Sequence, residues 1–186
     1  MLGIAIIGCG GIAGKRHAPE YSANQSAELR GVYDVRRESA EELAAKYGGR
    51  VFESLEELLS RPEIHAVSVC AINALHADIA VSALEQGKHV LVEKPMAESE
   101  KDIARMLDAA KASGRRLLVG HNQRLMPAHR IGHDRIASGE LGRILTFRTA
   151  FCHSGPETFA SAGGAWYYRR GFMTSSLTDL GIHKFD

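Results

Sequence analysis

A glycine-rich turn between a short apolar run and a helix constrains the fold of this chain more than any other feature. Ile4 to Ile7 form an apolar run, rich in β-branched residues and bounded by glycine, which predicts a strand buried on both faces. The run leads into the pattern Gly8-x-Gly10-x-x-Ala13, after which Lys15 to Ser22 can continue as a helix. Gly8 permits a tight turn, Gly10 removes a side chain so that a pyrophosphate can approach the backbone, and Ala13 permits close helix–strand packing.

The residues around this turn predict a dinucleotide site. The free N–H groups at the start of the helix, with the positive end of its dipole, would face phosphate groups. We therefore expect the cofactor to contact four residues of the turn: Gly8, Gly10, Gly11 and Ile12. The alternative, a tight turn followed by a capping aspartate, is less favoured by the order strand, loop, helix and acid.

The acid in that order is Asp34, which ends a second apolar run, Leu29 to Tyr33, about 20 residues beyond the loop. A carboxylate there accepts hydrogen bonds from the adenosine ribose and repels a 2′-phosphate, which predicts NAD. Arg36 and Arg37 follow at once. Because a guanidinium there can bind a 2′-phosphate, NADP remains the alternative, and Arg36 is a candidate cofactor-binding residue.

Composition indicates an ordinary globular protein. Of 186 residues, 45% are hydrophobic and 24% are charged, and the net charge of +1 gives no electrostatic argument for nucleic acid or an anionic membrane as a partner. No apolar run approaches the ~20 residues of a transmembrane helix. Met1 lies almost directly on the first strand, so we expect no leader segment and a cytoplasmic protein. Three scattered cysteines indicate reduced thiols, with neither a disulfide framework nor a metal site.

Strands and helices alternate as far as residue 122. Strands are predicted at Val51-Phe52, Ala66–Ala71, His89–Val92 and Leu117–Val119, and helices at Arg37–Tyr47, from a capping box at Ser54 through Leu59, at Ala77–Glu85 and at Ser99–Ala112. The last helix is expected to bury one face made of Ile103, Met106, Leu107 and Ala110. This alternation predicts an α/β fold, a Rossmann doubly wound parallel sheet, over residues 1–122.

The pattern changes over residues 123–186. A helix is expected at Pro127–Ala137, a long strand at Ile144–Cys152, a loop over 153–172 and a further helix at Ser175–Phe185. One strand and two helices cannot bury their own apolar faces. We therefore expect this part to be the beginning of an α+β C-terminal domain that is cut short.

Several motifs in fixed order carry a family resemblance. They are Asn73-x-x-His76, Gly87-Lys88-His89-Val90, Glu93-Lys94-Pro95, Gly120-x-Asn122-x-Arg124-x-x-Pro127, Gly139-Glu140-Leu141-Gly142 and Asp179-Leu180-Gly181-Ile182-His183-x-x-Asp186. With the glycine-rich turn, they make the chain resemble the glucose–fructose oxidoreductase / inositol dehydrogenase family. The resemblance implies hydride transfer between NAD(P) and a secondary alcohol of a sugar, inositol or similar polyol. It also implies a C-terminal open sheet that backs the substrate pocket and mediates homo-oligomerisation.

The resemblance also implies roles for individual residues. Lys94, just past the end of a strand, would hold and polarise the substrate oxygen, although a lone lysine there can equally be a surface residue. His183 would be the general base, and Asp179, four residues before it, would orient it. The alternative for these two is an i,i+4 surface pair.

Five further positions match family residues near the cofactor. Asn73, His76 and Glu93 would line the nicotinamide side, although His76 can equally be a residue that merely begins a helix. Asn122 and Arg124 would reach the nicotinamide or close the domain interface. Two alternatives to a working enzyme stay open: a non-catalytic NAD(P)-binding sensor, and a truncated chain that binds the dinucleotide but turns over poorly.

Overall fold

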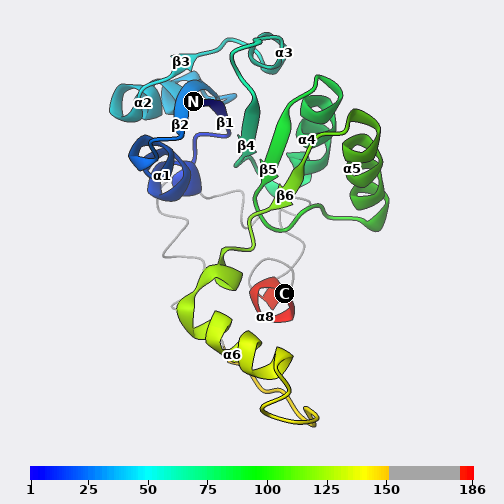
Figure 1. The fold of residues 1–186 in the computed structure, drawn as a ribbon. Helices are drawn as coiled ribbons and strands as arrows, with labels where there is room; N and C mark the ends of the chain where they lie inside the picture. The colour runs from blue at the N-terminus through cyan, green and yellow to red at the C-terminus, as the bar shows by residue number, and fades with distance from the viewer. Residues whose placement is uncertain (151–180) are drawn as a thin grey trace. The chain divides into compact units, whose positions relative to one another are not determined.

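The computed structural model describes residues 1–150 and 181–186. The chain consists of two units, Met1–Val119 and Gly120–Asp186, whereas the boundary expected from the sequence lies after residue 122. Figure 1 shows the chain from its N-terminus to its C-terminus. Within the described ranges, every helix is too short or too polar to cross a bilayer.

Six parallel strands form the sheet of the first unit, in the order β3-β2-β1-β4-β5-β6. The strands are β1 (Leu2–Ile7), β2 (Ala27–Tyr33), β3 (Arg50–Val51), β4 (Ala66–Val69), β5 (His89–Val92) and β6 (Leu117–Val119). The first half of the sheet is built outward from β1 to β3, and the second half is built outward from β4 to β6. The predicted doubly wound sheet is therefore confirmed, with its switch point between β1 and β4, where ligands of such sheets bind.

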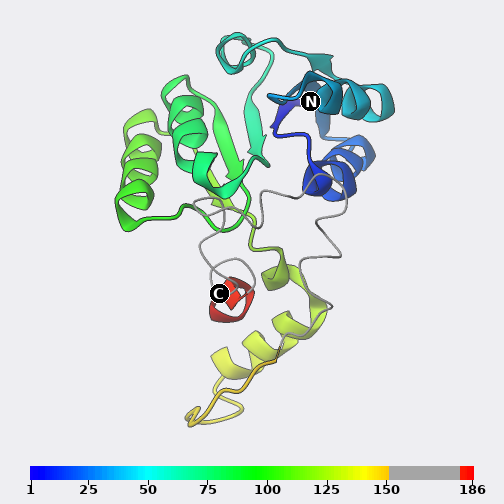
Figure 2. The same ribbon diagram turned by 180° about the vertical axis from the view of Figure 1, so that it is seen from behind.

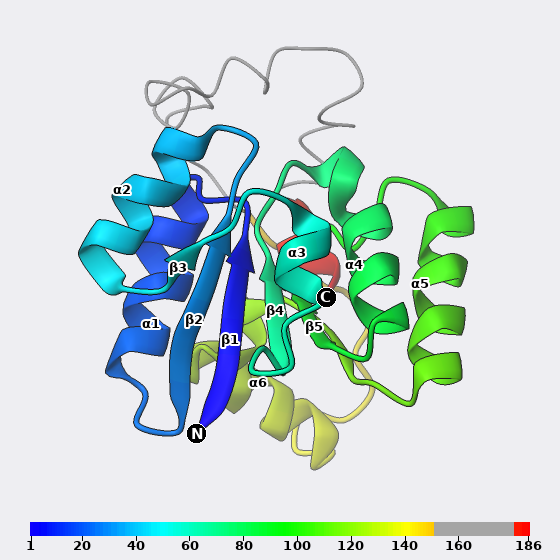
Figure 3. The ribbon, with the colours of Figure 1, turned by 90° about the horizontal axis from the view of Figure 1, so that it is seen from above.

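Helices connect the strands on both sides of the sheet. They are the π-helix η1 (Ala13–His17), α1 (Ala18–Ala23), α2 (Arg37–Tyr47), α3 (Leu55–Leu59), the 3-10 helix η2 (Asn73–Leu75), α4 (His76–Glu85) and α5 (Glu100–Ser113). In Figure 3, α1 and α2 lie beside β1–β3, whereas α4 and α5 lie beside β4–β6. Figure 2 shows the ribbon of Figure 1 from behind. The helices α3 and α5 begin after the serines at which the sequence predicts them to start. The Ser54 and Ser99 hydroxyls accept hydrogen bonds from Glu57 N (3.0 Å) and Asp102 N (3.1 Å).

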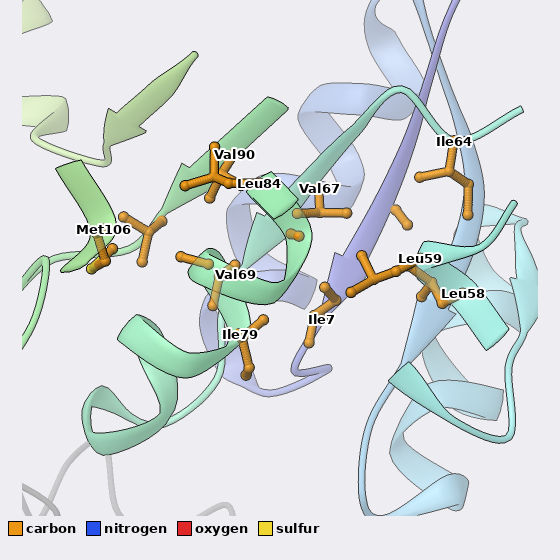
Figure 4. Close-up of a cluster of buried hydrophobic side chains, with 14 of the residues drawn as sticks. Ile7, Leu58, Leu59, Ile64, Val67, Val69, Ile79, Leu84, Val90 and Met106 are labelled. Atoms are coloured by element: carbon orange, nitrogen blue, oxygen red, sulfur yellow. The ribbon is translucent and has the colours of Figure 1, made fainter. Parts of the chain in front are cut away.

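The core consists of two clusters, one on each face of the sheet. Alternate residues of β1 point to opposite clusters: Ile7 packs with Val67 and Met106 against α4 and α5, and Ile6 packs with Leu43 against α1 and α2. Figure 4 shows the first cluster, in which Ile7, Val67, Val69 and Met106 are labelled. Because each fully buried aliphatic side chain contributes about 1.5–3 kcal/mol, this two-sided burial fixes β1 firmly.

The structure corrects two expectations. Met106 is buried as expected, but Leu107 is 54% exposed, and the other residue that α5 buries is Ala109. Leu107 follows Met106 by one position, about 100° round the helix, so it lies off the buried stripe. Residues 144–150 form no strand, because a strand needs a hydrogen-bonded neighbour and none pairs with them among the described residues. Cys152, the end of that expected strand, lies outside the described residues.

The second unit contains three described helices: the 3-10 helix η3 (Asn122–Leu125), α6 (Pro127–Ala137) and α8 (Ile182–Phe185). The helix predicted over Pro127–Ala137 has those bounds. Of the helix expected over Ser175–Phe185, only the end at α8 falls in the described part of the chain, and the loop expected over 153–172 falls outside it.

Candidate functional site

The carboxyl ends of the central strands lie level with one another. Ile7 pairs with Tyr33 of β2 and Val69 of β4, and Val69 pairs with Val92 of β5. The residues that follow these strands therefore meet at one edge of the sheet. They are Gly8, Asp34, Cys70 and Glu93, three of which the sequence assigned to cofactor binding.

Gly8 allows the turn that follows β1. Its φ is +91°, and a Cβ at this position would lie 2.5 Å from Ala71 N and 2.6 Å from the Cys70 carbonyl carbon. Any side chain would therefore be strained by its backbone conformation and would collide with the chain after β4. Its N–H donates to Tyr33 O (2.8 Å), which ties the turn to β2 as well.

Gly10 and Gly11 differ from Gly8, because they face open space. A Cβ built on either residue meets no heavy atom of the described chain within 4 Å. Next to them, Ala13 is completely buried at the start of η1. A ligand can therefore approach the backbone at Gly10 and Gly11, while packing at Ala13 fixes the helix start. That these residues and Ile12 bind a cofactor stays a prediction.

Asp34 holds the loop through its carboxylate. Oδ2 accepts a hydrogen bond from Cys9 N (2.7 Å), and Oδ1 accepts one from Arg36 N (2.8 Å). Each oxygen keeps a second lone pair, so acceptance from a ribose hydroxyl is compatible with these bonds. Burial, with the nearby Asp34 charge, raises the pKa of the Cys9 thiol to about 12, which makes this cysteine unreactive.

Two arginines follow Asp34, and their surroundings differ. The Arg37 guanidinium pairs with Glu41 (2.7 Å) and with Glu53, so its charge is offset. Arg36 is exposed, and its described hydrogen bonds are made by its backbone, with the Asp34 carboxylate and with Ser39 N. Of the two, Arg36 is the better placed to meet an anionic group.

Lys94 follows β5 and precedes Pro95 through a cis peptide bond. It is half-buried, and its N–H donates to Oε2 of Glu93 (3.2 Å). Oε1 of Glu93 accepts a hydrogen bond from Nε2 of His17 (2.8 Å). Burial raises the pKa of Glu93, but His17 and Lys94 outweigh it and hold that pKa below the ordinary value. Both oxygens of Glu93 are therefore bonded within the protein, Oε1 to the His17 ring and Oε2 to the Lys94 backbone.

Sequence analysis missed His17. It lies four residues after Ala13, on the same face of the turn, and is 8% exposed. That spacing from a residue expected to be buried was the available signal. Its partner lies 76 residues away in the sequence, so the pattern of the helix could not reveal it.

His76 and Asn73 lie between β4 and α4. The His76 ring is fully buried, with Nδ1 2.8 Å from Pro95 O and Nε2 3.1 Å from Ala71 O. Burial lowers the pKa of His76, which favours the neutral ring, whose single N–H donates to one of these two carbonyls. The ring thus supports the backbone beside Lys94 rather than presenting an atom to a ligand. Asn73 is 6% exposed, and its Nδ2 has no acceptor in the described part of the chain, which leaves a donor available.

In the second unit, Arg124 makes a two-pronged ion pair. Its Nε lies 2.7 Å from Oδ2 of Asp186, and its Nη2 lies 2.6 Å from Oδ1. The Asp186 side chain is 9% exposed, and the Arg124 hydrogen bonds lower its pKa. The resemblance implied that Arg124 reaches the nicotinamide or closes the domain interface, and that role stays a prediction. In the structure its guanidinium has a protein partner, and the pair joins η3 to α8.

Three further residues that the sequence assigns to the site are His183, Asn122 and Asp179. His183 lies on α8, and it is half-buried. Asn122 begins η3 and is exposed, with its N–H bonded to Gly120 O (2.9 Å). Asp179 lies outside the described residues. No group of three or more histidine, cysteine or acidic side chains within residues 1–150 and 181–186 is arranged to hold a metal ion.

Comparison with known proteins agrees with this architecture. Residues 2–121 match the oxidoreductase family with an NAD-binding Rossmann fold, and residues 130–186 match the C-terminal domain of the same family. The chain belongs to the GFO/IDH/MocA oxidoreductase family. The resemblance drawn from the sequence motifs is thereby confirmed.

Two of the similar curated proteins are sugar dehydrogenases. The chain is 37% identical to glucose-6-phosphate 3-dehydrogenase of Bacillus subtilis over 186 residues, which cover 98% of this chain and 51% of the relative. It is 32% identical to D-glucoside 3-dehydrogenase of Escherichia coli, covering 100% of this chain and 52% of the relative. The chain thus spans about half the length of these curated relatives.

Solved structures show the same fold. A 3-ketoreductase from Actinomadura kijaniata in complex with NADP matches with a TM-score of 0.71 and 31% identity, over 77% of this chain and 46% of that one. A structure described as a putative myo-inositol dehydrogenase from Sinorhizobium meliloti matches with a TM-score of 0.78 and 25% identity, over 100% of this chain and 53% of that one. The family is thus one of NAD(P)-dependent oxidoreductases with sugar-directed members.

Proposed function

We propose that this chain is the cofactor-binding part of an NAD(P)-dependent dehydrogenase that acts on a secondary alcohol of a sugar or related polyol. The observation that carries the proposal is the edge where the strands end. There, the open backbone of Gly10 and Gly11, the Asp34 carboxylate and Lys94 follow strands whose carboxyl ends lie at one edge of the sheet. The sugar-directed relatives supply the substrate class.

The residues present fit a dinucleotide. Gly10 and Gly11 leave room for phosphates against the backbone, Asp34 keeps free lone pairs for ribose hydroxyls, and the Asn73 amide nitrogen has no acceptor among residues 1–150 and 181–186. We propose NAD as the cofactor, because a carboxylate at Asp34 repels a 2′-phosphate. The exposed guanidinium of Arg36 supports NADP as the alternative, the nucleotide in the related ketoreductase structure.

The proposed chemistry divides among three side chains. When bound, the nicotinamide supplies a hydride acceptor. Lys94 holds the substrate hydroxyl and stabilises the developing alkoxide through its ammonium group. His183 takes the hydroxyl proton, since an imidazole with a reference pKa of ~6.5 is matched to neutral pH, and Asp179 orients it.

Replacing Lys94 with Ala tests the proposal. The variant should bind NADH as the unaltered chain does and lose turnover on a panel of pyranosides and inositols by about 10²-fold or more. Lys101, an exposed lysine of α5, provides the matched control, because Lys101→Ala should change neither quantity. Wild-type turnover in the Lys94 variant would refute the catalytic role and leave a dinucleotide-binding sensor. Failure of the unaltered chain to bind NADH and NADPH would refute the cofactor assignment.

A further inference from the structure

One buried pair of titratable side chains has no part in the chemistry proposed above. It joins His17, at the end of η1, to Glu93, at the end of β5. The side chains are 8% and 15% exposed, and Nε2 to Oε1 measures 2.8 Å. Taking a carboxylate and its polar partner out of water is costly, and apolar side chains of the same volume often stabilise a fold as well or better. The pair therefore calls for an explanation other than stability.

The pair lies between the two parts of the proposed site. η1 begins at Ala13, directly after the open glycines of the turn. Glu93 precedes Lys94, and its second oxygen accepts the N–H of that lysine (3.2 Å). A single carboxylate thus receives one hydrogen bond from the helix of the phosphate turn and another from the backbone of Lys94.

Other contacts fix the orientation of His17. Its ring meets the Tyr21 ring edge to face, with centroids 6.2 Å apart. The Tyr21 hydroxyl is hydrogen-bonded to Ser68 of β4, which is completely buried. The Glu93 N–H donates to Val69 O (2.9 Å) at the end of the same strand. Both partners of the pair are therefore anchored to β4.

We propose that His17 is a positioning residue for Lys94, acting through the carboxylate of Glu93. Without the His17 N–H, the Glu93 carboxylate loses its strongest partner and turns towards water, and the Lys94 N–H loses its acceptor. The backbone at Lys94 then samples other conformations, and its ammonium group spends less time where the substrate hydroxyl binds. This inference rests on the proposed function for the role of Lys94, whereas the hydrogen-bonded chain from His17 to the Lys94 N–H is independent of it.

Two substitutions separate positioning from packing. His17→Leu removes the hydrogen-bond donor and fills its place with an apolar side chain. His17→Gln keeps an N–H at a similar reach, because the glutamine amide nitrogen stands close to the place of Nε2. Hydrogen exchange of the Lys94 amide, followed by NMR, should be about tenfold faster in His17→Leu and close to the unaltered rate in His17→Gln. Turnover should fall about tenfold or more in the leucine variant, with the KM for the dinucleotide unchanged, and recover in the glutamine variant.

His65 provides the matched control. Its Nδ1 accepts the Gly3 N–H (2.8 Å) at the amino end of β1, the edge of the sheet away from Lys94. His65→Leu removes a backbone hydrogen bond of similar length and should leave Lys94 exchange and turnover unchanged.

An unchanged Lys94 exchange rate in folded His17→Leu overturns the inference, as does a glutamine variant that behaves like the leucine variant. If the unaltered chain turns over no sugar, the proposed function fails, and the exchange measurement still decides whether His17 positions Lys94.

Discussion

Alanine at Gly8 and at Gly10 should act in opposite ways, although the two glycines lie two positions apart. At Gly8 the left-handed backbone costs a residue with a Cβ about 1–2 kcal/mol. The Cβ would also lie 2.5 Å from Ala71 N, and the backbone shift needed to relieve that overlap adds about 1–3 kcal/mol. Gly8→Ala should therefore lower the free energy of unfolding by about 2–5 kcal/mol, as measured by urea denaturation.

Gly10→Ala should stabilise the free protein and weaken binding. Gly10 does not adopt a positive φ, and its Cβ would meet no described atom within 4 Å. Restricting the unfolded chain then adds about 0.4–1 kcal/mol to the free energy of unfolding. The same methyl group would occupy the space in which a pyrophosphate approaches the amides. Loss of one charge-assisted hydrogen bond should weaken NADH binding about 10–100-fold in a fluorescence titration.

Gly132 supplies the control for this comparison. It lies inside α6 with no described atom near its Cβ position, so Gly132→Ala should stabilise the chain by about 0.5–1 kcal/mol and leave NADH affinity unchanged. A Gly10→Ala protein that binds NADH as tightly as the unaltered chain would refute the assignment of this turn to the phosphates. A Gly8→Ala protein of undiminished stability would refute the steric reasoning.

Three further predictions concern charged side chains. Lys88 is 7% exposed, and its ammonium group donates to the carbonyls of Arg61 (2.6 Å) and Ile64 (2.8 Å), which follow α3. Lys88→Met removes both hydrogen bonds and should lower the free energy of unfolding by about 2–4 kcal/mol, whereas Lys101→Met should change it by less than about 0.5 kcal/mol. The pKa of Glu93 is depressed in the folded protein, so the stabilisation by its carboxylate is present above the ordinary glutamate pKa of about 4.3 and is lost as pH falls through the lower folded value. Glu93→Gln should remove that part of the acid dependence of the free energy of unfolding. The same pH dependence in the variant and in the unaltered chain would contradict this. Lysine in Arg124→Lys cannot reproduce the two-pronged contact to Asp186, so the hydrogen exchange of the α8 amides should become several-fold faster. The same exchange rate in the variant and in the unaltered chain would show that the pair does not hold the helix.

Local signals explain how much of the fold could be predicted from the sequence. The strand at His89–Val92 and the helix at Pro127–Ala137 have the predicted bounds, because glycine and proline punctuate the chain beside them. The turn at Gly8 was predictable because its conformation and its crowding both demand glycine. Leu107 was assigned to the wrong face, since its apolar character alone cannot show which side α4 covers.

Long-range pairs account for most of what the sequence could not show. The contacts of His17 with Glu93 and of Arg124 with Asp186 join residues 76 and 62 positions apart. No periodicity links such partners, because the first pair depends on how the strands are ordered and the second on how η3 and α8 pack. The motif containing His76 was recognised, but only the fold shows that its ring is enclosed between two backbone carbonyls. The strand expected over Ile144–Cys152 does not form at residues 144–150 for a related reason, since pairing depends on a neighbour that local sequence does not specify.

The most direct test of the account is a crystal structure of this chain with NADH or NADPH bound. We expect the pyrophosphate against the amides of Gly10, Gly11 and Ile12, the adenosine ribose at Asp34, and the nicotinamide ring beside Lys94. A dinucleotide bound elsewhere on the chain, or with its ring turned away from Lys94, would contradict it.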